Sequence, residues 1–330
     1  MPPSIADLKS ALHLQSALIP NVSPFQIVSD PKIGSKRVLR SIYPAGSYSG
    51  SGDKHAAFTA TPLSNNAFQG KVSRYVRLEY QLYFQPGFNW VKGGKLPGIL
   101  VGEEKGCNGG CSGGGSAEFC FSTRMMWRAN GGGEMYLYAA KSVYFPDQPP
   151  ESCKRSMEAS SPEALFRLRQ RNINPYRIPT EADEVYMTSK GVVKRADGSC
   201  LNGMGVTISP GATNVCNPTY GISIGRGGKF QFKSGTWHNI TQIVRVNSKG
   251  KAKRDGFLSV YLDGKQVIKA TNLVFLKSGY DPSTTAPNHL VKLMFSSFFG
   301  GHTKDYATPT KQWIDWRGFK MTTSATNIWK

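Results

Sequence analysis

The chain has 330 residues, including 36 Gly and 20 Pro, and only 19% of its residues are charged. This composition, rich in turn formers, aromatic and β-branched residues, favours an all-β protein over a helical one. The formal net charge is +20, from 41 Lys and Arg against 21 Asp and Glu. Such a charge suits a nucleic acid, an anionic membrane surface or an acidic glycan as partner, or a basic surface that only keeps the protein soluble. No stretch approaches about eighteen apolar residues, which excludes a membrane-spanning helix.

Residues 1–36 are predicted to be an N-terminal extension packed on the core. Four apolar residues there follow an approximate helical period, which two prolines end: Ile5, Leu8, Leu12 and Leu14, then Pro20 and Pro24. From Arg37 onward the pattern changes to short strands separated by glycine-rich turns. We therefore expect a single domain over residues 37–330.

The clearest strand pattern runs from Tyr75 to Phe84, where apolar residues alternate with Arg77, Glu79 and Gln81. Further strands are predicted near residues 118–128, 134–144, 239–247, 257–262, 265–270, 290–299 and 312–321. Asp263-Gly264 lies between two of them and is a strong hairpin signal. The spacing and two-faced alternation predict a β-jelly-roll sandwich of two antiparallel sheets, one of which forms a concave ligand groove.

Residues 146–200 interrupt the strand pattern. Ser160-Ser161-Pro162-Glu163 is typical of a helix start and is followed by an apolar turn. We interpret this segment as a long insertion with a short helix, packed beside the sheet, because it is too polar to form a core of its own.

The cysteines favour disulfide bonds over a zinc site. They are six in number: Cys107, Cys111, Cys120, Cys153, Cys200 and Cys216. Cys107 and Cys111 have C-x3-C spacing, but no second ligand pair of the usual spacing follows. We expect a Cys111–Cys120 bond, because the glycine-rich loop between them closes easily. Cys200–Cys216 is the next pairing we expect, which leaves Cys107–Cys153.

Two N-glycosylation sequons, at Asn21 and Asn239, agree with disulfide bonds in indicating secretion. The start of the sequence has no basic region followed by an apolar one. We therefore expect a secreted, extracellular chain whose signal peptide is absent from this sequence.

Two consecutive predicted strands carry a distinctive polar face. Over residues 118–128, alternation places Phe119, Phe121, Thr123, Met125 and Trp127 on one face and Cys120, Ser122, Arg124, Met126 and Arg128 on the other. After a glycine-rich turn, Met135 and Leu137 face the core while Tyr136 and Tyr138 face away. With a hairpin centred near Gly131, Arg124 lies opposite Tyr138, and Arg128 meets Glu134. An ordinary polar outer face would show a similar pattern.

The chemistry of these side chains suits one reaction. Cleaving a 4-linked uronic acid by β-elimination requires a cation or strong donor on the carboxylate, a base for the C5 proton and an acid for the leaving O4. Arginine binds a carboxylate through two parallel hydrogen bonds. Tyrosines can serve as base and acid, provided that a nearby Arg or Lys lowers a phenol pKa from about 10.

Four ordered segments resemble polysaccharide lyase family 14, which contains alginate lyases of marine molluscs and lyases of chlorella viruses, with relatives in fungi. They are Lys92-Gly-Gly-Lys95-Leu-Pro-Gly98, Phe121-Ser-Thr-Arg124-Met-Met-Trp-Arg128, Glu134-Met-Tyr136-Leu-Tyr138 and Phe298-Phe-Gly-Gly301. The resemblance covers residues 37–320 apart from the insertion. It implies a jelly roll that cleaves 1,4-linked uronate polymers, glucuronan or alginate, without a required metal or cofactor.

The resemblance also implies roles for individual residues. The family's catalytic lysine corresponds to Lys95, its strand serine and arginine to Ser122 and Arg124, and its tyrosine pair to Tyr136 and Tyr138. A glycine-rich segment closed by a disulfide resembles residues 111–120. Our candidate site has catalytic Lys95, Arg124, Tyr136 and Tyr138, with Ser122, Arg128 and His238 as substrate-binding residues. Which tyrosine is the base stays open, and the insertion and surplus cysteines leave the preferred uronate open.

Other interpretations of these residues make different demands. A non-catalytic lectin on the same sandwich would bind acidic glycan without needing paired tyrosines beside Lys95. A nucleic-acid-binding protein lacks a supporting RRM, KH or zinc-finger motif here. A glycoside hydrolase needs two carboxylates flanking a groove, and this face offers only Glu118 and Glu134. Taken alone, Lys95 is an ordinary lysine near a Pro-Gly turn, and His238 an ordinary residue that packs a strand start.

We expect a monomeric enzyme whose partner is an acidic polysaccharide, with no metal, cofactor, nucleic acid or membrane.

Overall fold

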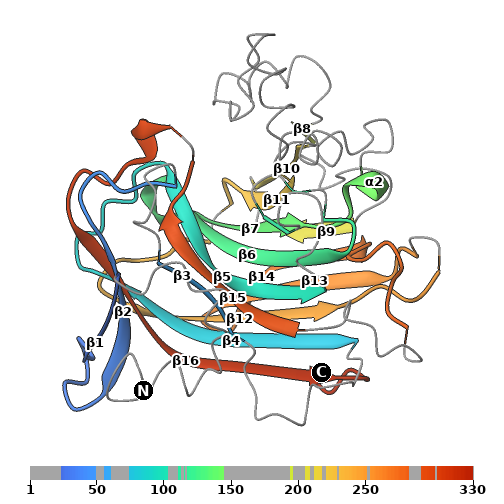
Figure 1. Cartoon of the computed structure of the whole chain (residues 1–330), viewed down its shortest axis with the longest axis horizontal. Coiled ribbons are helices and arrows are strands. Elements are labelled where there is room, and N and C mark those ends of the chain that lie inside the picture. The colour runs from blue at the N-terminus through green and yellow to red at the C-terminus, as the bar shows by residue number, and fades with distance from the viewer. Residues whose placement is uncertain are drawn as a thin grey trace, which may run out of the picture.

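The computed structural model describes residues 24–49, 56–60, 74–102, 111–112, 115, 117–144, 194–195, 205–208, 212–217, 221–228, 230–250, 253–281, 291–301 and 303–329. These residues form two eight-stranded sheets and very little helix. Figure 1 shows the sheets as two layers, with β6 and β7 in one and β4 and β16 in the other. All strand pairs are antiparallel. The predicted β-jelly-roll sandwich is confirmed.

The first sheet, sheet A, carries the residues of the candidate site. Its strands, in spatial order, are β3 (Ala56–Ala60), β15 (Val291–Phe299), β5 (Gly93–Gly102), β6 (Cys120–Arg128), β7 (Gly133–Tyr138), β11 (Gly221–Arg226), β10 (Thr213–Asn217) and β8 (Lys194–Arg195).

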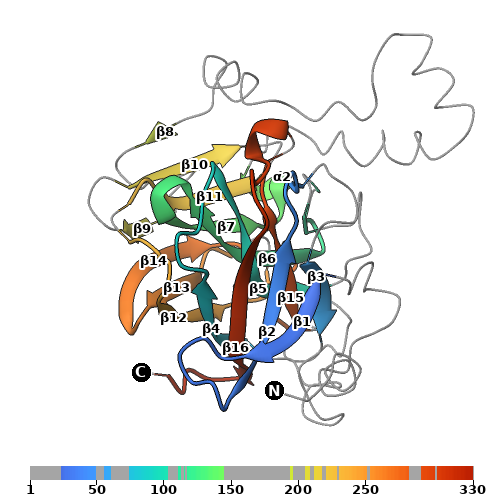
Figure 2. The same cartoon turned by 90° about the vertical axis from the view of Figure 1, so that its left-hand side faces the viewer.

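The second sheet, sheet B, closes the other side of the core. Its strands, in spatial order, are β1 (Phe25–Ser29), β2 (Arg37–Tyr43), β16 (Gln312–Ser324), β4 (Tyr75–Phe84), β12 (Trp237–Arg245), β13 (Gly256–Leu262), β14 (Lys265–Leu273) and β9 (Gly205–Ile208). In Figure 2, β1, β2, β16 and β4 lie side by side in this sheet.

The inner faces of the two sheets meet in one aromatic core. Phe295 of β15 packs edge-on against Trp316 of β16 at 5.0 Å between ring centroids, and Phe84 of β4 lies 5.8 Å from Trp127 of β6. Edge-to-face packing of this kind adds to the hydrophobic gain from burying the rings. With one face of sheet A fixed against the core, its outer face is left to carry polar side chains.

Several strand predictions are confirmed, and two local ones are wrong. Residues 75–84 form β4 as predicted, but the strand predicted over 134–144 ends at Tyr138, because residues 141–144 form the helix α2 (Lys141–Tyr144). Glu118 accepts hydrogen bonds from the backbone and hydroxyl of Ser142 in the first turn of α2, at 2.9 and 2.5 Å. Phe119, predicted to face the core, is 56% exposed because β6 begins only at Cys120.

The N-terminal extension predicted over residues 1–36 contributes β1, which is an edge strand of sheet B paired with β2. The helical period near residues 5–14 and the helix start at Ser160 both lie outside the described residues. The described residues also include two short 3-10 turns, η3 (Ala129–Gly131) and η5 (Lys304–Tyr306). Of the described helices, none has the length and apolar character needed to cross a membrane.

Candidate active site

Lys95 reaches the outer face of sheet A through a bulge in β5. Lys95 pairs with Met126 and Gly98 pairs with Arg124, so Leu96 and Pro97 together oppose Met125 alone. In a regular strand, residues 95 and 98 would face opposite sides of the sheet. The bulge reverses the alternation, which places Leu96 in the core and leaves Lys95 beside the side chains of β6 and β7.

Gly98 allows β5 to approach β6 closely at the bulge. A Cβ atom at this position would lie 1.5 Å from the carbonyl oxygen of Thr123 and 2.8 Å from the Cα atom of Arg124. No side chain fits such a space without moving the backbone. The Lys-Leu-Pro-Gly segment therefore shapes the backbone of β5 and also supplies Lys95.

The hairpin of β6 and β7 has a register two residues away from the predicted one. Arg124 pairs with Tyr136, and Ser122 pairs with Tyr138. The turn is tighter than predicted, because the Arg128 N–H donates to the carbonyl of Gly132 at 2.6 Å and Asn130 has a φ of 58°. A shift of two residues keeps every side chain on its predicted face, so the polar face survives the error.

The four residues predicted to be catalytic lie together on this face. Lys95 Nζ is 3.4 Å from the ring centroid of Tyr136 and donates to Met126 Sδ at 3.2 Å. The rings of Tyr136 and Tyr138 are 5.3 Å apart between centroids, and the Arg124 guanidinium is 5.6 Å from the Tyr138 ring. The Lys95 amine and the Arg124 guanidinium thus face the two aromatic rings.

Burial shifts the protonation of Lys95 toward the neutral amine. Desolvation lowers the pKa of Lys95 well below its ordinary value, and the nearby positive charges of Arg124 and Arg128 lower it further, while Glu134 opposes them. The amine can therefore accept a proton at a pH where an exposed lysine cannot.

The pKa of Tyr136 shifts in the direction opposite to the one we expected. We expected a neighbouring Arg or Lys to lower a phenol pKa, but burial and the adjacent Tyr138 raise the pKa of Tyr136 well above its ordinary value, despite the charge of Arg128. Desolvation penalises the charged form of either group, so it favours the neutral amine and the neutral phenol alike. Tyr136 therefore retains its proton.

Arg124 is a buried cation with unused hydrogen-bonding capacity. It is 3% exposed, its Nη1 donates to Ser296 Oγ of β15 at 3.5 Å, and its Nε has no hydrogen-bond partner among the described residues. Sequence reasoning missed Ser296, because residues on non-consecutive strands meet only through the sheet order. The nearby Phe298-Phe299-Gly300-Gly301 motif was the one available signal.

Arg128 is held at the edge of the same face by Glu134. Its Nη2 donates to Glu134 Oε1 at 2.5 Å, and Arg226 Nε of β11 lies 3.8 Å from the other carboxylate oxygen. Burial would raise the pKa of the fully buried Glu134, but Arg128 and Arg226 bring it below its ordinary value, so the carboxylate stays ionised. The predicted contact of Arg128 with Glu134 is confirmed, as a diagonal one.

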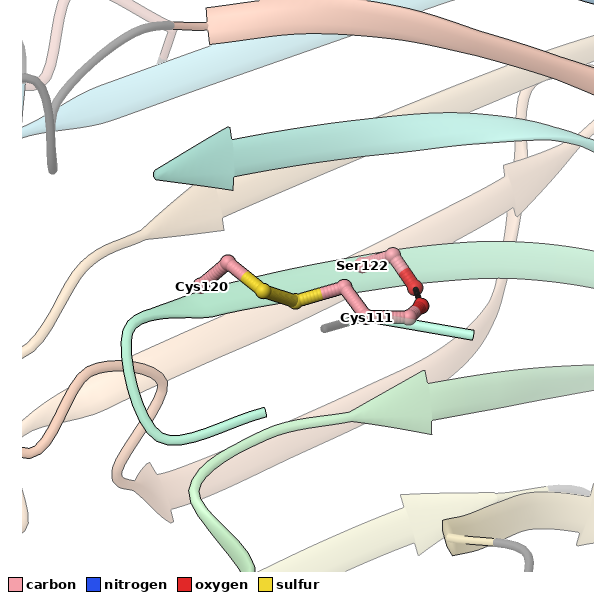
Figure 3. The surroundings of a disulfide bond; sticks show 3 residues. All are labelled: Cys111, Cys120 and Ser122. Carbon is pink, nitrogen blue, oxygen red and sulfur yellow. Dashed lines mark hydrogen bonds between the residues drawn. A yellow bond between two sulfur atoms is a disulfide. The ribbon is translucent and has the colours of Figure 1, made fainter. Parts of the chain in front are cut away.

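The disulfide between Cys111 and Cys120 is confirmed, and Figure 3 shows Ser122 beside it. The fully buried Ser122 hydroxyl donates to the carbonyl of Cys111 at 2.6 Å, so it ties the disulfide loop to β6. Both cysteines belong to a small apolar cluster that includes Tyr138. The structure therefore places the Ser122 hydroxyl against the backbone of Cys111. The pairings proposed for Cys107, Cys153, Cys200 and Cys216 fall outside the described side chains.

His238 is not part of this cluster, and its placement there was wrong. It lies on β12 of sheet B, where it pairs with Leu82 and packs its ring 5.8 Å from Phe232. The Lys233 N–H donates to its Nε2 at 2.8 Å, and its Nδ1 lies 2.7 Å from Asp263 Oδ2. His238 thus packs inside sheet B with both ring nitrogens engaged, whereas the cluster is on the outer face of sheet A. Within the described chain, no group of three or more His, Cys, Asp and Glu side chains is arranged to hold a metal ion.

A family model for polysaccharide lyase 14 matches residues 31–193 and 201–319. The chain belongs to polysaccharide lyase family 14. The expected family is confirmed, and the protein is a polysaccharide lyase. A search of curated proteins finds no match for this family 14 lyase.

Two solved structures are similar to this family 14 lyase over most of both chains. The crystal structure of the marine PL-14 alginate lyase from Aplysia kurodai is 26% identical, with a TM-score of 0.56, over 91% of this chain and 87% of that one. Alginate lyase vAL-1 from Chlorella virus is 17% identical, with a TM-score of 0.51, over 91% and 88% of the two chains. The second likeness concerns the fold alone.

Proposed function

We propose that this lyase cleaves a 1,4-linked uronate polymer by β-elimination and that alginate is its substrate. The observation that carries the proposal is the contact of Lys95, Arg124, Tyr136 and Tyr138 on one face of sheet A. The Aplysia kurodai protein, named an alginate lyase and 26% identical, supports alginate as the first polymer to test. Glucuronan is the alternative substrate.

Arg124 binds the carboxylate of the sugar that is cleaved. Its guanidinium carries free donor capacity in a buried setting, where a charge-assisted hydrogen bond is stronger than in water. Negative charge grows on this carboxylate as the C5 proton leaves. A cation held in place before the reaction stabilises that charge without reorganisation.

Lys95 is the base in this mechanism. Its neutral amine takes the proton from C5, the C5–H electron pair forms the C4=C5 double bond, and the C4–O4 bond breaks. The base is thus assigned to the lysine and not to a tyrosine, because the pKa of Lys95 is lowered whereas that of Tyr136 is raised.

Tyr136 is the acid that protonates the leaving O4. Its phenol keeps its proton, and its ring lies against Lys95 Nζ, so the acid and the base reach neighbouring carbon atoms of one sugar. Tyr138 packs against the rings and side chains of Tyr136 and Arg124 and belongs to the apolar cluster of the disulfide. It orients Tyr136 and Arg124. Arg128, fixed by Glu134, binds a further part of the polyanion.

The same proposal includes an extracellular site of action. The Cys111–Cys120 bond supports an oxidising compartment, since disulfides are rare where glutathione keeps thiols reduced.

The test follows the ultraviolet absorbance of the new double bond during incubation with alginate and, separately, with glucuronan. Tyr136→Phe and Tyr138→Phe should each lower kcat, by about 10²–10⁴-fold for the phenol that acts as acid. Tyr261→Phe, on β13 of sheet B, is the matched control and should leave kcat unchanged. A double Phe variant that released unsaturated uronate at a near-normal rate would sink the mechanism. Binding of alginate by the wild type without any product would favour the lectin.

A further inference from the structure

The inner side of the β5 bulge is held by two side chains from the opposite sheet. The carbonyl oxygen of Pro97 accepts a hydrogen bond from the Tyr80 hydroxyl at 3.0 Å and a longer one from the Gln242 amide at 3.4 Å. Tyr80 belongs to β4 and Gln242 to β12, both in sheet B. These side chains therefore cross the core to reach the backbone that follows Lys95.

The same network also reaches β6. The Thr123 hydroxyl donates to the side-chain oxygen of Gln242 at 2.9 Å, and Thr123 immediately precedes Arg124. Tyr80, Thr123 and Gln242 are each at most 1% exposed. A polar group buried without a partner is costly, whereas a satisfied network inside a core is rigid. The backbone segments that carry Lys95 and Arg124 are thus joined through one buried amide.

Pro97 makes the bulge depend on these side chains. A proline has no N–H, so its carbonyl is the one backbone hydrogen-bonding group it can offer. Pro97 is buried, so its carbonyl is shielded from water. If both donors are removed, the Pro97 carbonyl is buried without these hydrogen bonds. Rotation of the peptide toward another donor then lowers the free energy of the folded protein.

We propose that Tyr80 and Gln242 are positioning residues for Lys95, which act by holding the Pro97 carbonyl and with it the bulge that turns Lys95 to the outer face. The inference rests on the proposed function in assigning Lys95 to the reaction. Both residues act through the backbone of β5, since they lie on the core side of sheet A, opposite the site. Nothing in the sequence pattern distinguishes them from ordinary core residues.

The test compares Tyr80→Phe, Gln242→Met and the double variant with Tyr144→Phe. Tyr144 is a matched control, because its fully buried hydroxyl accepts one hydrogen bond, from the Val274 N–H at 2.8 Å, outside the bulge network. The double variant should lower kcat by about 10- to 100-fold with little change in KM, because a small misplacement of a reacting group suffices for such a loss. Loosening the bulge also hydrates Lys95, so the rising limb of kcat/KM should move to higher pH. A purely structural role would lower Tm but leave that limb in place.

Lys95→Met, measured in parallel, separates the two proposals. If Lys95→Met stays active, the proposed function fails. If Lys95→Met is inactive, while the Tyr80 and Gln242 variants lose only Tm, as Tyr144→Phe does, the positioning role is overturned. Should the double variant unfold at the assay temperature, Tyr80→Phe alone decides, because it removes the shorter of the two bonds and keeps the ring.

Discussion

Lys95 and Tyr136 contact each other, yet their pKa values move in opposite directions. Burial has the same effect on both, since it disfavours whichever form carries charge. For an amine this lowers the pKa, and for a phenol it raises the pKa. One partly buried site thus holds a neutral amine, which can accept a proton, and a neutral phenol, which can donate one, over the same pH range.

The first prediction concerns the pH dependence of kcat/KM. Activity should rise with pH as Lys95 loses its proton, and it should fall only in strongly alkaline solution, where Tyr136 ionises. Arg128→Gln should shift the rising limb to higher pH, because removing a nearby positive charge raises the pKa of Lys95. A pH series at constant ionic strength tests both statements, and a limb that moves to lower pH in Arg128→Gln would contradict the assignment.

The second prediction is that Lys95→Met stabilises the fold while abolishing activity. Because the folded-state pKa of Lys95 is lowered, the unfolded chain binds more protons between that pKa and about 10.4. Lys95 therefore costs stability in full below this window and progressively less as the pH rises through it. Removing the amine should raise Tm by about 2–4 °C near neutral pH. The gain should shrink as the pH rises toward the unfolded-state pKa and should vanish above it.

Thermal unfolding of Lys269→Met, an exposed lysine on β14, provides the control for this stability effect. It should leave Tm nearly unchanged at every pH. A Lys95→Met variant that is less stable than the wild type at neutral pH would show that the buried amine does not destabilise the folded protein.

The sequence identified the catalytic candidates but not their protonation. Arg124, Tyr136 and Tyr138 were placed on one face by alternation, and Lys95 by family resemblance. The raised pKa of Tyr136 depends on burial by residues from several strands, which no local pattern encodes. His238 was misplaced for a similar reason, because its partners Asp263 and Lys233 are set by the tertiary fold.

Among the secondary-structure elements, β5 was the one most easily overlooked. Its residues include Pro97 and glycines, which disfavour strands, and the predicted strands contain no such segment. The alternation of apolar residues made β4 predictable from the sequence, whereas the bulge in β5 interrupts such alternation. The hairpin register also escaped prediction, since it depends on the conformation of Asn130.

The third prediction is that Gly98→Ala damages both stability and activity. The added methyl group would overlap the Thr123 carbonyl and force β5 away from β6. We expect a loss of about 2 kcal/mol or more in the free energy of unfolding, together with a large fall in kcat. Chemical denaturation checks the first effect. Gly34→Ala is the control, because a Cβ there meets nothing within 4 Å; equal stability of the two variants would refute the close approach.

For the molecule as a whole, composition alone indicated the correct fold class. The high glycine and proline content and the β-branched and aromatic residues are what a two-sheet sandwich with many turns requires. The boundary of the extension was less readable, because β1 is a short edge strand that pairs on one side only. The net charge indicated a polyanion but not which one.

The fourth prediction concerns the net charge of +20. If this field steers a polyanion toward the enzyme, added salt should lower kcat/KM on long chains much more than it lowers kcat, because the Debye length is about 10 Å at 0.1 M salt. Initial rates on long and short alginate fragments over a salt series measure this effect. A value of kcat/KM on long chains that does not change with salt would remove steering, while the site assignment would remain.

The desolvated amine of Lys95 has a consequence for inhibitor chemistry. A lysine that is neutral when exposed lysines are protonated is a nucleophile as well as a base. An acylating group carried on a short uronate oligosaccharide would be brought to this amine by Arg124 and would modify it ahead of the many surface lysines. The same lowered pKa that supports Lys95 as the proposed base therefore makes its Nζ atom a target for selective, irreversible labelling.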